Sequence, residues 1–340
     1  MDPLTHIALG ASLGYAGFGR RLGRHAATAG GLAAFAPDAD IFISSATDPL
    51  LAIEYHRGFT HAVAFAPVGA AVVAALWLLH RDWRTPARWL PLWLCSLVAY
   101  ISHELLDAAT SYGTRLWWPL SDHREGWDLI SIIDPPITLA LLAGIAWAVV
   151  RRNMRPSVLG LAAAALYLGF GAVQHGRAVN AVRQIARARG HTVTRLEAMP
   201  TMANNVVWRA LYLHDGRIHS DRIRVGWFSA PTVREGWSLP VVGPADLSSA
   251  EKSRDTRRSF ARFAWFSENW VGRSPADATV LADMRYSLSS EAFDPIWGIR
   301  FTPAGSPNEV EWINRTRNRD LGLRPLWDEM TGRDPRFRPL

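Results

Sequence analysis

The sequence predicts an all-α polytopic membrane helical bundle in the N-terminal half, followed by a small soluble α+β domain. Residues up to about 175 are rich in Ala, Leu, Val, Gly and Trp, and their charges are confined to short clusters. From about residue 177 onward, charged and polar residues are spread evenly. Because 340 residues suffice for two domains, we expect a transmembrane domain over residues 1–175 and a soluble domain over 176–340.

Long apolar stretches support the membrane part of this prediction. A bilayer core of about 30 Å requires roughly 20 apolar residues in a helix. The stretches that approach this length are Ala62–Leu79, Trp89–Leu106, Pro135–Val150 and Pro156–Val173. Two shorter stretches are predicted as tilted, short or re-entrant helices, namely Ile7–Phe18 and Ala26–Pro37. Within the first, Gly10 and Gly14 have the spacing that lets helix backbones approach closely in lipid, although a merely glycine-rich helix has the same pattern.

Clusters of arginine between these stretches predict the topology. If each stretch crosses once, three basic loops lie on one side, which the positive-inside rule makes cytoplasmic. The opposite side then holds the loops 38–61 and 107–134 and everything after Val173. Arg177 and the arginines after it argue against this assignment, because they follow the last stretch on the side opposite the basic loops. We therefore expect a multi-pass protein of the bacterial inner membrane with a periplasmic C-terminal domain. The basic loops contain Arg20, Arg21 and Arg24; Arg81, Arg84 and Arg88; and Arg151, Arg152 and Arg155.

Charge and cysteine usage exclude several kinds of partner and site. The net charge is +7, but Lys252 is the only lysine among 37 basic residues. This bias is typical of a GC-rich genome, so we expect no nucleic-acid partner. The single cysteine, Cys95, lies in an apolar stretch, which predicts neither a disulfide nor a thiolate metal site. An acidic Asp2 replaces the basic residues of a signal peptide, so we expect insertion through internal helices.

The C-terminal half has the pattern of a small α+β domain. An Asp215-Gly216 turn between two β-prone runs predicts a hairpin. No catalytic signature is evident in this half. The expected helices are 174–189 and Ser248–Asn269, and the expected strands are Val206–Leu213, Arg217–Phe228, Thr279–Leu288, Ile296–Phe301 and Val310–Asn314.

Histidine and aspartate residues of the N-terminal half gather on one predicted face. The seven that we predict as metal ligands all fall opposite the basic loops, whereas chance would scatter them between the two faces. His103 and Asp107 are four residues apart, so both project from one helix face and can bind one ion. Imidazole and carboxylate without thiolate suit zinc, or another first-row metal such as manganese or iron. The predicted metal ligands are His6, Asp38, Asp40, His56, His61, His103 and Asp107.

Each element also has an ordinary structural interpretation. A single interfacial histidine is more often a hydrogen-bonded surface group than a ligand, and His103 with Asp107 is compatible with an interhelical hydrogen bond. Asp38 and Asp40 are compatible with a turn at a helix end, and the segment 56–61 with a turn at Gly58. The coincidence of the four elements on one face favours the metal site.

Four ordered motifs resemble the YdjM-type, LexA-regulated, inner-membrane metal-dependent hydrolases. They are the N-terminal Asp-Pro-Leu-Thr-His, Pro37-Asp38-Ala39-Asp40, His56-Arg57-Gly58-Phe59-Thr60-His61 and His103-Glu104-Leu105-Leu106-Asp107. Thr110-Ser111-Tyr112-Gly113-Thr114 and Trp117-Trp118-Pro119 resemble the continuation, so the likeness covers residues 1–175. It implies a distant relation to zinc-dependent phospholipase C and the zinc single-strand nucleases. A late His-x-x-x-Glu of those relatives is missing, which argues against a three-metal site.

The resemblance and the cluster together predict a metal-dependent phosphoesterase, with lipid as a plausible substrate. Metal-activated water would be the nucleophile. Asp38 or Asp40 would bridge ions or act as base, and Glu104 would support a neighbouring ligand. Arg57 would pair with a phosphate, or form a structural salt bridge. Further acidic and histidine residues on this face either complete the site or cap a loop: Asp122, His123, Asp128 and Asp134.

Other functions remain open at this point. A metal-dependent peptidase or amidase would use the same activated water, although His-Glu-x-x-His is missing from the sequence. A metal-binding transporter or an envelope structural protein is the alternative outside enzymology, but transport would favour polar groups at mid-bilayer. The C-terminal domain could instead bind a partner and leave the membrane part as an anchor. Membrane lipid is the expected partner, and the oligomeric state cannot be read from the sequence.

Overall fold

The computed structural model describes the chain except residues 80, 249–252, 288–292, 304–305, 307 and 317–322. The chain divides into two compact units. The first contains Met1–Phe42 and Tyr55–Val173, and the second contains Ile43–Glu54 and Gln174–Leu340. In the second unit, Arg262 forms ion pairs with Asp48 at 2.9 Å and with Glu54 at 2.7 Å. These contacts fasten the early segment 43–54 to the C-terminal unit, which the sequence pattern does not reveal.

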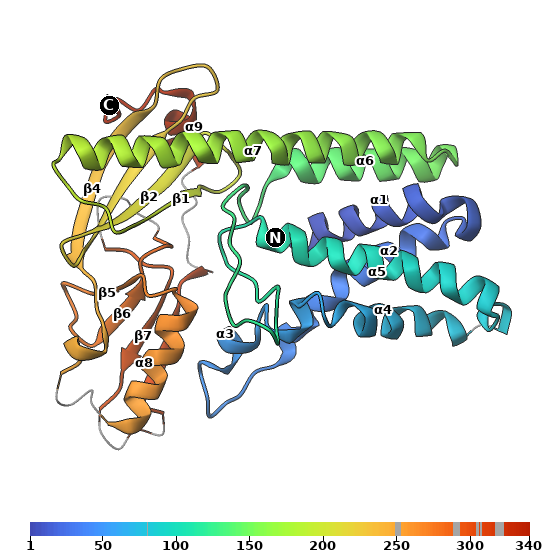
Figure 1. Cartoon of the computed structure of the whole chain (residues 1–340), viewed down its shortest axis with the longest axis horizontal. Coiled ribbons are helices and arrows are strands. Elements are labelled where there is room, and N and C mark those ends of the chain that lie inside the picture. The colour runs from blue at the N-terminus through green and yellow to red at the C-terminus, as the bar shows by residue number, and fades with distance from the viewer. Residues whose placement is uncertain (80, 249–252, 288–292, 304–305, 307, 317–322) are drawn as a thin grey trace. The chain divides into compact units, whose positions relative to one another are not determined.

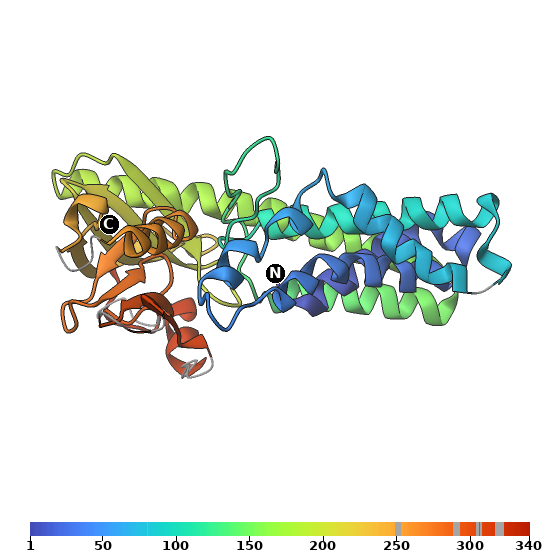
Figure 2. The ribbon, with the colours of Figure 1, turned by 90° about the horizontal axis from the view of Figure 1, so that it is seen from below.

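The first unit is a bundle of helices that pack side by side (Figure 1, Figure 2). The first helix begins where Asp2 caps it by accepting a hydrogen bond from the Thr5 amide, with Pro3 at the first helical position. It ends at Gly23, whose φ of 58° favours glycine. The helices of this unit are α1 (Pro3–Leu22), α2 (His25–Phe35), η1 (Ala36–Phe42), η2 (Phe59–His61), α4 (Ala66–Ala75), η3 (Leu76–Leu79), η4 (Arg81–Trp83), α5 (Pro86–Ala108) and α6 (Pro135–Arg151). The first part of α7 (Arg155–Ala188) also belongs to it, whereas most of α3 (Leu51–Tyr55) lies in the second unit.

Among the described residues, two helices are long and apolar enough to cross a membrane: α5 and α7 (Arg155–Ala188). The helical segments Leu51–His61 and Ala66–Leu79 are bent by 83° relative to each other. Taken together as one broken span, they would be a third candidate. The apolar helix α6 is shorter. A helical N-terminal half with candidate membrane spans is therefore confirmed, whereas a crossing by every predicted stretch stays a prediction.

Helix α7 differs from the expectation in its length. The sequence predicts a span over Pro156–Val173 and a separate helix over 174–189, but the structure has one helix of 34 residues. The change from apolar to polar residues at Gln174 alters the surroundings of the helix without breaking its backbone. At 1.5 Å per residue α7 is about 51 Å long, well beyond the thickness of a bilayer core.

The second unit contains two antiparallel sheets. One has the strand order β1-β2-β3-β4-β9 and the other β5-β6-β7-β8. Helix α8 (Arg254–Phe266) packs against the second sheet, and α9 (Leu323–Thr331) and η5 (Pro244–Asp246) complete the described elements. The strands are β1 (Arg195–Pro200), β2 (Val207–His214), β3 (Arg217–Arg224), β4 (Thr232–Pro240), β5 (Val271–Arg273), β6 (Val280–Asp283), β7 (Trp297–Phe301), β8 (Val310–Asn314) and β9 (Arg338–Pro339).

The last part of α7 covers the first sheet. Its inward positions repeat every three to four residues, as expected for one buried helix face, and they contact Trp208, Tyr212 and Ile223 of the sheet. This hydrophobic core joins strands that are far from α7 in the sequence. The buried positions of α7 are Ala178, Ala181, Val182, Ile185 and Ala186.

The predicted hairpin is confirmed, because Asp215 and Gly216 have φ of 48° and 68° and connect β2 to β3. This is the backbone twist that two-residue hairpin turns prefer. Strand β3 ends at Arg224, so the expected extension to Phe228 is wrong. The expected helix 248–269 and strand 279–288 are present in shorter form as α8 and β6, while their residues 249–252 and 288 lie outside the described part. Strands β1, β4, β5 and β9 and helix α9 were not expected.

Close backbone packing joins α1 to α2. A Cβ added to Gly10 would lie 2.3 Å from the carbonyl oxygen of Gly30 and 2.4 Å from the Cβ of Ala34. A Cβ added to Gly14 would lie 2.3 Å from the carbonyl oxygen of Ala26. The small-xxx-small spacing therefore marks a true helix interface.

We expect Gly10→Ala to destabilise the protein by about 1–3 kcal/mol, because overpacking forces the two backbones apart. The matched control is Gly17→Ala on the same helix, where an added Cβ meets nothing within 4 Å and alanine should be neutral or slightly stabilising. Thermal unfolding followed by circular dichroism in detergent compares the two. Equal melting temperatures of the two variants would show that the contact at Gly10 does not restrict that position to glycine.

Candidate metal centre

Four side chains from three segments of the first unit meet at one point. His103 and Asp107 project from the last turns of α5, where their spacing places them on one face. Asp38 comes from η1, which continues α2, and His61 comes from η2. The turn before η2 is closed by Gly58, where an added Cβ would lie 2.6 Å from the Tyr55 carbonyl oxygen.

The separations among these side chains match those of metal ligands. Nε2 of His61 and Nε2 of His103 each lie 3.4 Å from Oδ2 of Asp107. They lie 3.6 and 3.7 Å from Oδ1 of Asp38. All four ligand atoms lie within 4.8 Å of one another. Tetrahedral zinc with bonds near 2.0–2.2 Å places its ligands about 3.3–3.6 Å apart, so the group fits one cation with little movement.

The ligand atoms also lack other partners. Nε2 of His61, Nε2 of His103 and Oδ2 of Asp107 are buried and have no hydrogen-bond partner among the described residues. A buried polar atom without a partner costs about 1–3 kcal/mol. A bound cation would satisfy all three atoms at once. We call Asp38, His61, His103 and Asp107 the four-ligand group.

Hydrogen bonds on the far side of each imidazole orient its lone pair. Nδ1 of His103 lies 2.6 Å from the Ala34 carbonyl oxygen. Because a carbonyl only accepts, this nitrogen carries the proton, and Nε2 is left free to bind a cation. Nδ1 of His61 lies 3.2 Å from Oδ2 of Asp40, which favours the same tautomer. Such partners behind metal-binding histidines are the rule in metalloproteins.

Asp40 organises the segment that carries His61. Its carboxylate accepts hydrogen bonds from His56 Nδ1 at 2.8 Å, the Arg57 amide at 2.9 Å and Thr60 Oγ1 at 3.0 Å. Burial alone would raise the pKa of Asp40, but hydrogen bonds from His56 and His61 lower it below the usual value. The carboxylate is thus ionised at neutral pH and is already occupied by donors.

Asp38 is the most exposed member of the four-ligand group. Its side chain is 13% exposed, whereas those of His61, His103 and Asp107 are fully buried. Burial raises the pKa of Asp38, but the neighbouring imidazoles of His61 and His103 lower it to about 2. The group is therefore open to solvent on the side of Asp38.

The second oxygen of Asp107 is held by positive and hydrogen-bonding groups. Oδ1 lies 2.8 Å from the guanidinium of Arg57 and 3.1 Å from Nε2 of His6, and it also contacts the amino group of Met1. Arg57 donates a further hydrogen bond to Thr110 Oγ1 at 3.0 Å and lies over the ring of Tyr112. In the structure Arg57 thus forms the salt bridge that was its alternative interpretation.

The remaining predicted residues surround the four-ligand group. The ring of His6 stacks on that of His103, with centroids 3.7 Å apart. His56 is hydrogen-bonded to Asp40, and its ring lies edge-on to that of His61 with centroids 6.0 Å apart. Glu104 is fully buried beside His103, and its carboxylate oxygens have no hydrogen-bond partner in the described part of the chain. Asp122 forms an exposed ion pair with Arg115. His123, Asp128 and Asp134 also lie outside the four-ligand group.

Sequence reasoning missed several supporting groups. Thr60 and Thr110 lie within the motifs quoted above, but a hydroxyl has no distinctive pattern. Tyr112 supports Arg57 through its ring. The acceptor at Ala34 is a backbone carbonyl, and no side-chain type marks such a position.

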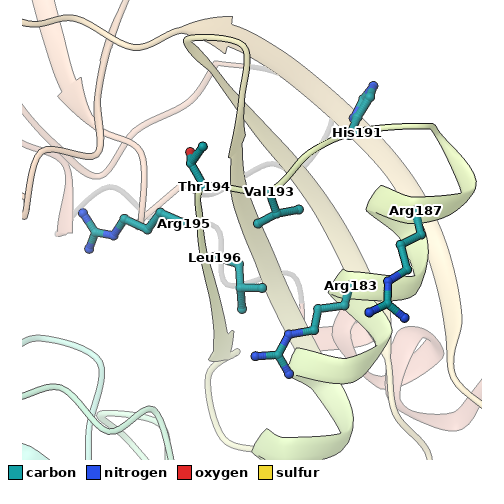
Figure 3. A pocket seen from close by; sticks show the side chains of 7 residues that line it. All are labelled: Arg183, Arg187, His191, Val193, Thr194, Arg195 and Leu196. Carbon is teal, nitrogen blue, oxygen red and sulfur yellow. The ribbon is translucent and has the colours of Figure 1, made fainter.

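A pocket of the second unit holds none of these residues. Its volume is about 380 Å³, and Figure 3 shows Arg183 and Arg187 extending from α7 at its edge. No acidic residue is among those that line it, although Arg195 forms ion pairs with Glu197 and Glu268 nearby. The lining residues are Arg183, Arg187, His191, Val193, Thr194, Arg195 and Leu196.

Comparison with known proteins identifies the first unit. A family model described as YdjM inner membrane protein matches residues 1–178, which contain the whole four-ligand group. The chain belongs to the YdjM inner membrane protein family. Similar proteins include the uncharacterized protein YfhP of Bacillus subtilis, 32% identical over 153 residues, which are 43% of this chain and 46% of YfhP.

A second relative of this chain is the inner membrane protein YbcI of Escherichia coli. It is 32% identical over 133 residues, which are 38% of this chain and 75% of YbcI. The match thus spans about half of YfhP and three quarters of YbcI. No solved structure matches the chain.

We expect Asp40→Asn to weaken metal binding by about 10–100-fold, because His61 loses the anionic acceptor behind its imidazole. Titration against a competing chelator measures the affinity. Asp122→Asn, at an exposed position of the same unit, is the control and should bind as the wild type does. A melting temperature of the metal-free variant close to that of the wild type excludes unfolding as the cause, and an unchanged affinity would refute the supporting role of Asp40.

Proposed function

We propose that the first unit is a membrane-bound metal-dependent hydrolase that acts on phosphoesters, lipid phosphoesters among them. The observation that carries the proposal is the four-ligand group, whose ligand atoms lie at ligand spacing and of which His61, His103 and Asp107 each offer a buried atom without another partner. Two of its members lie in the last two turns of α5, a candidate membrane span. Ionisable groups in such a position are functional by default because burying them near lipid is costly.

Zinc is the metal that this donor set favours, and manganese and iron accept the same imidazole and carboxylate ligands. When bound, the cation supplies a Lewis acid that activates water near neutral pH and stabilises negative charge on a phosphoryl oxygen. The proposed ligands are Asp38, His61, His103 and Asp107, with His6, Asp40 and His56 in supporting positions.

The protein's own groups divide the remaining work. Arg57 and His6 hold one oxygen of Asp107 so that the other faces the ligand position. Asp40 accepts several hydrogen bonds and is less available to take a proton, so the more exposed Asp38 is the stronger candidate for the base. Glu104 is buried, and we assign it support of the His103 turn. Because Arg57 is engaged with Asp107, its proposed role is to position that ligand.

A structural metal site is the competing proposal, and one observation favours it. Four protein ligands complete a tetrahedral zinc shell, whereas catalytic zinc usually keeps one position for water. The enzyme proposal therefore requires five-coordination or release of the exposed Asp38. A metal-dependent peptidase or amidase would use the same centre, and only the substrate distinguishes it. A transporter is less well supported, because the ligands cluster at helix ends.

We expect the purified wild type to contain metal and to hydrolyse phosphodiesters or phospholipids, with turnover falling to background in His103→Ala and Asp107→Ala. Elemental analysis and assays with bis-p-nitrophenyl phosphate, phospholipid vesicles and a peptide panel measure these properties. Asp122→Asn should retain both metal and activity. Stoichiometric metal without turnover on any substrate would leave the structural role, and a metal-free wild type would remove both proposals.

The orientation in the membrane is a further part of the proposal, supported by the arginine clusters at 20–24, 81–88 and 151–155. We expect a reporter fused after residue 85 to be cytoplasmic and one fused to the C-terminus to be periplasmic. Green fluorescent protein and alkaline phosphatase fusions give opposite signals in the two compartments. Matching signals at both positions would overturn the proposed topology.

A further inference from the structure

A loop of the second unit exposes two adjacent aromatic side chains. Between β3 and β4, Trp227 is 54% exposed and Phe228 is 99% exposed. Isolated exposed apolar residues are common on soluble domains. A phenylalanine with almost its whole side chain in solvent beside a half-exposed tryptophan at a loop tip is the pattern of a surface that meets another apolar phase.

Hydrogen bonds fix this loop to α7. The guanidinium of Arg177 donates to the carbonyl oxygens of Gly226 at 2.8 Å, Trp227 at 3.1 Å and Ser229 at 2.8 Å. One side chain thus holds three successive parts of the loop backbone. The aromatic tip is therefore presented in a defined place.

The neighbouring contacts strengthen the attachment. Gln174, which is fully buried, donates to the carbonyl oxygens of Val225 at 2.8 Å and Asn205 at 3.1 Å. The indole Nε1 of Trp227 donates to Asn205 Oδ1 at 3.1 Å. The polar edge of the indole is satisfied within the protein, and its apolar part stays exposed.

The contacts with the loop lie at the end of the apolar part of α7. Gln174 and Arg177 follow directly on Val173, where the apolar run that begins at Pro156 ends. The helix continues unbroken through this point. Arg177 is four residues beyond Val173, or about 6 Å along the axis. The loop is therefore attached at the end of the apolar run, which is the point where α7, as a candidate span, would leave the hydrocarbon layer.

We propose that the Trp227–Phe228 loop inserts into the lipid interface beside α7 and anchors the second unit to the membrane surface. Tryptophan is enriched at this depth because its ring is amphipathic, and phenylalanine gains by moving from water to the acyl boundary. Arg177 also brings positive charge close to the phosphates of anionic lipids. The inference needs α7 to span the membrane and is independent of any hydrolytic activity.

The test uses the full chain with Cys95→Ala as background and a fluorescent label on Phe228→Cys. The protein is reconstituted in vesicles of phosphatidylethanolamine and phosphatidylglycerol that contain a lipid spin-labelled near its headgroup. The matched control is a label on Glu235→Cys, whose side chain is 81% exposed. Glu235 faces Arg189, which directly follows the C-terminal end of α7 and lies twelve residues from Arg177, or about 18 Å along the axis.

We expect the spin-labelled lipid to quench the label at position 228 severalfold more strongly than the label at 235, and aqueous iodide to show the reverse order. Equal accessibility of the two labels to iodide would overturn the proposal. A label at 228 that neither quencher reaches would also overturn it, because protein would then cover the loop. Both positions are exposed, so the labelled variants should melt as the background protein does.

Discussion

The carboxylate of Asp107 is the group on which the arrangement of the first unit depends. It is fully buried, and a buried carboxylate stays ionised at low cost only when it is paired and hydrogen-bonded. One oxygen is held by Arg57 and His6, from segments far away in the sequence, and the other faces His61 and His103. Packing the helices around the buried carboxylate of Asp107 therefore also brings the ligand atoms together.

The ligand chemistry was the most predictable part of this centre. The i, i+4 spacing of His103 and Asp107 needs only helix geometry, and the placement of the candidate ligands on one predicted face required only an approximate topology. Which of two neighbouring aspartates joins the four-ligand group was not predictable. Asp38 and Asp40 are two residues apart and chemically alike, yet only the fold makes one a member of the four-ligand group and the other the partner behind His61.

The fold was predictable where local signals were strong. Apolar stretches and the Asp215-Gly216 turn specify their elements without reference to distant residues. The attachment of residues 43–54 to the second unit depends on Arg262, more than 200 residues later, and no local pattern encodes such a pairing. The continuity of α7 was missed for a related reason, because a change in hydropathy resembles a boundary although the backbone hydrogen bonds run through it.

The contact between α1 and α2 has a consequence for the imidazole of His103. Gly10 lies one turn from His6, and Gly30 lies one turn from Ala34, whose carbonyl oxygen accepts the proton of His103. Since the acceptor is main chain, a new side chain at position 34 cannot delete it. The hydrogen bond behind His103 instead depends on where the backbone of α2 lies beside α5, and the glycine contact with α1 helps to fix that backbone. Residues that never touch a ligand can therefore influence the imidazole of His103.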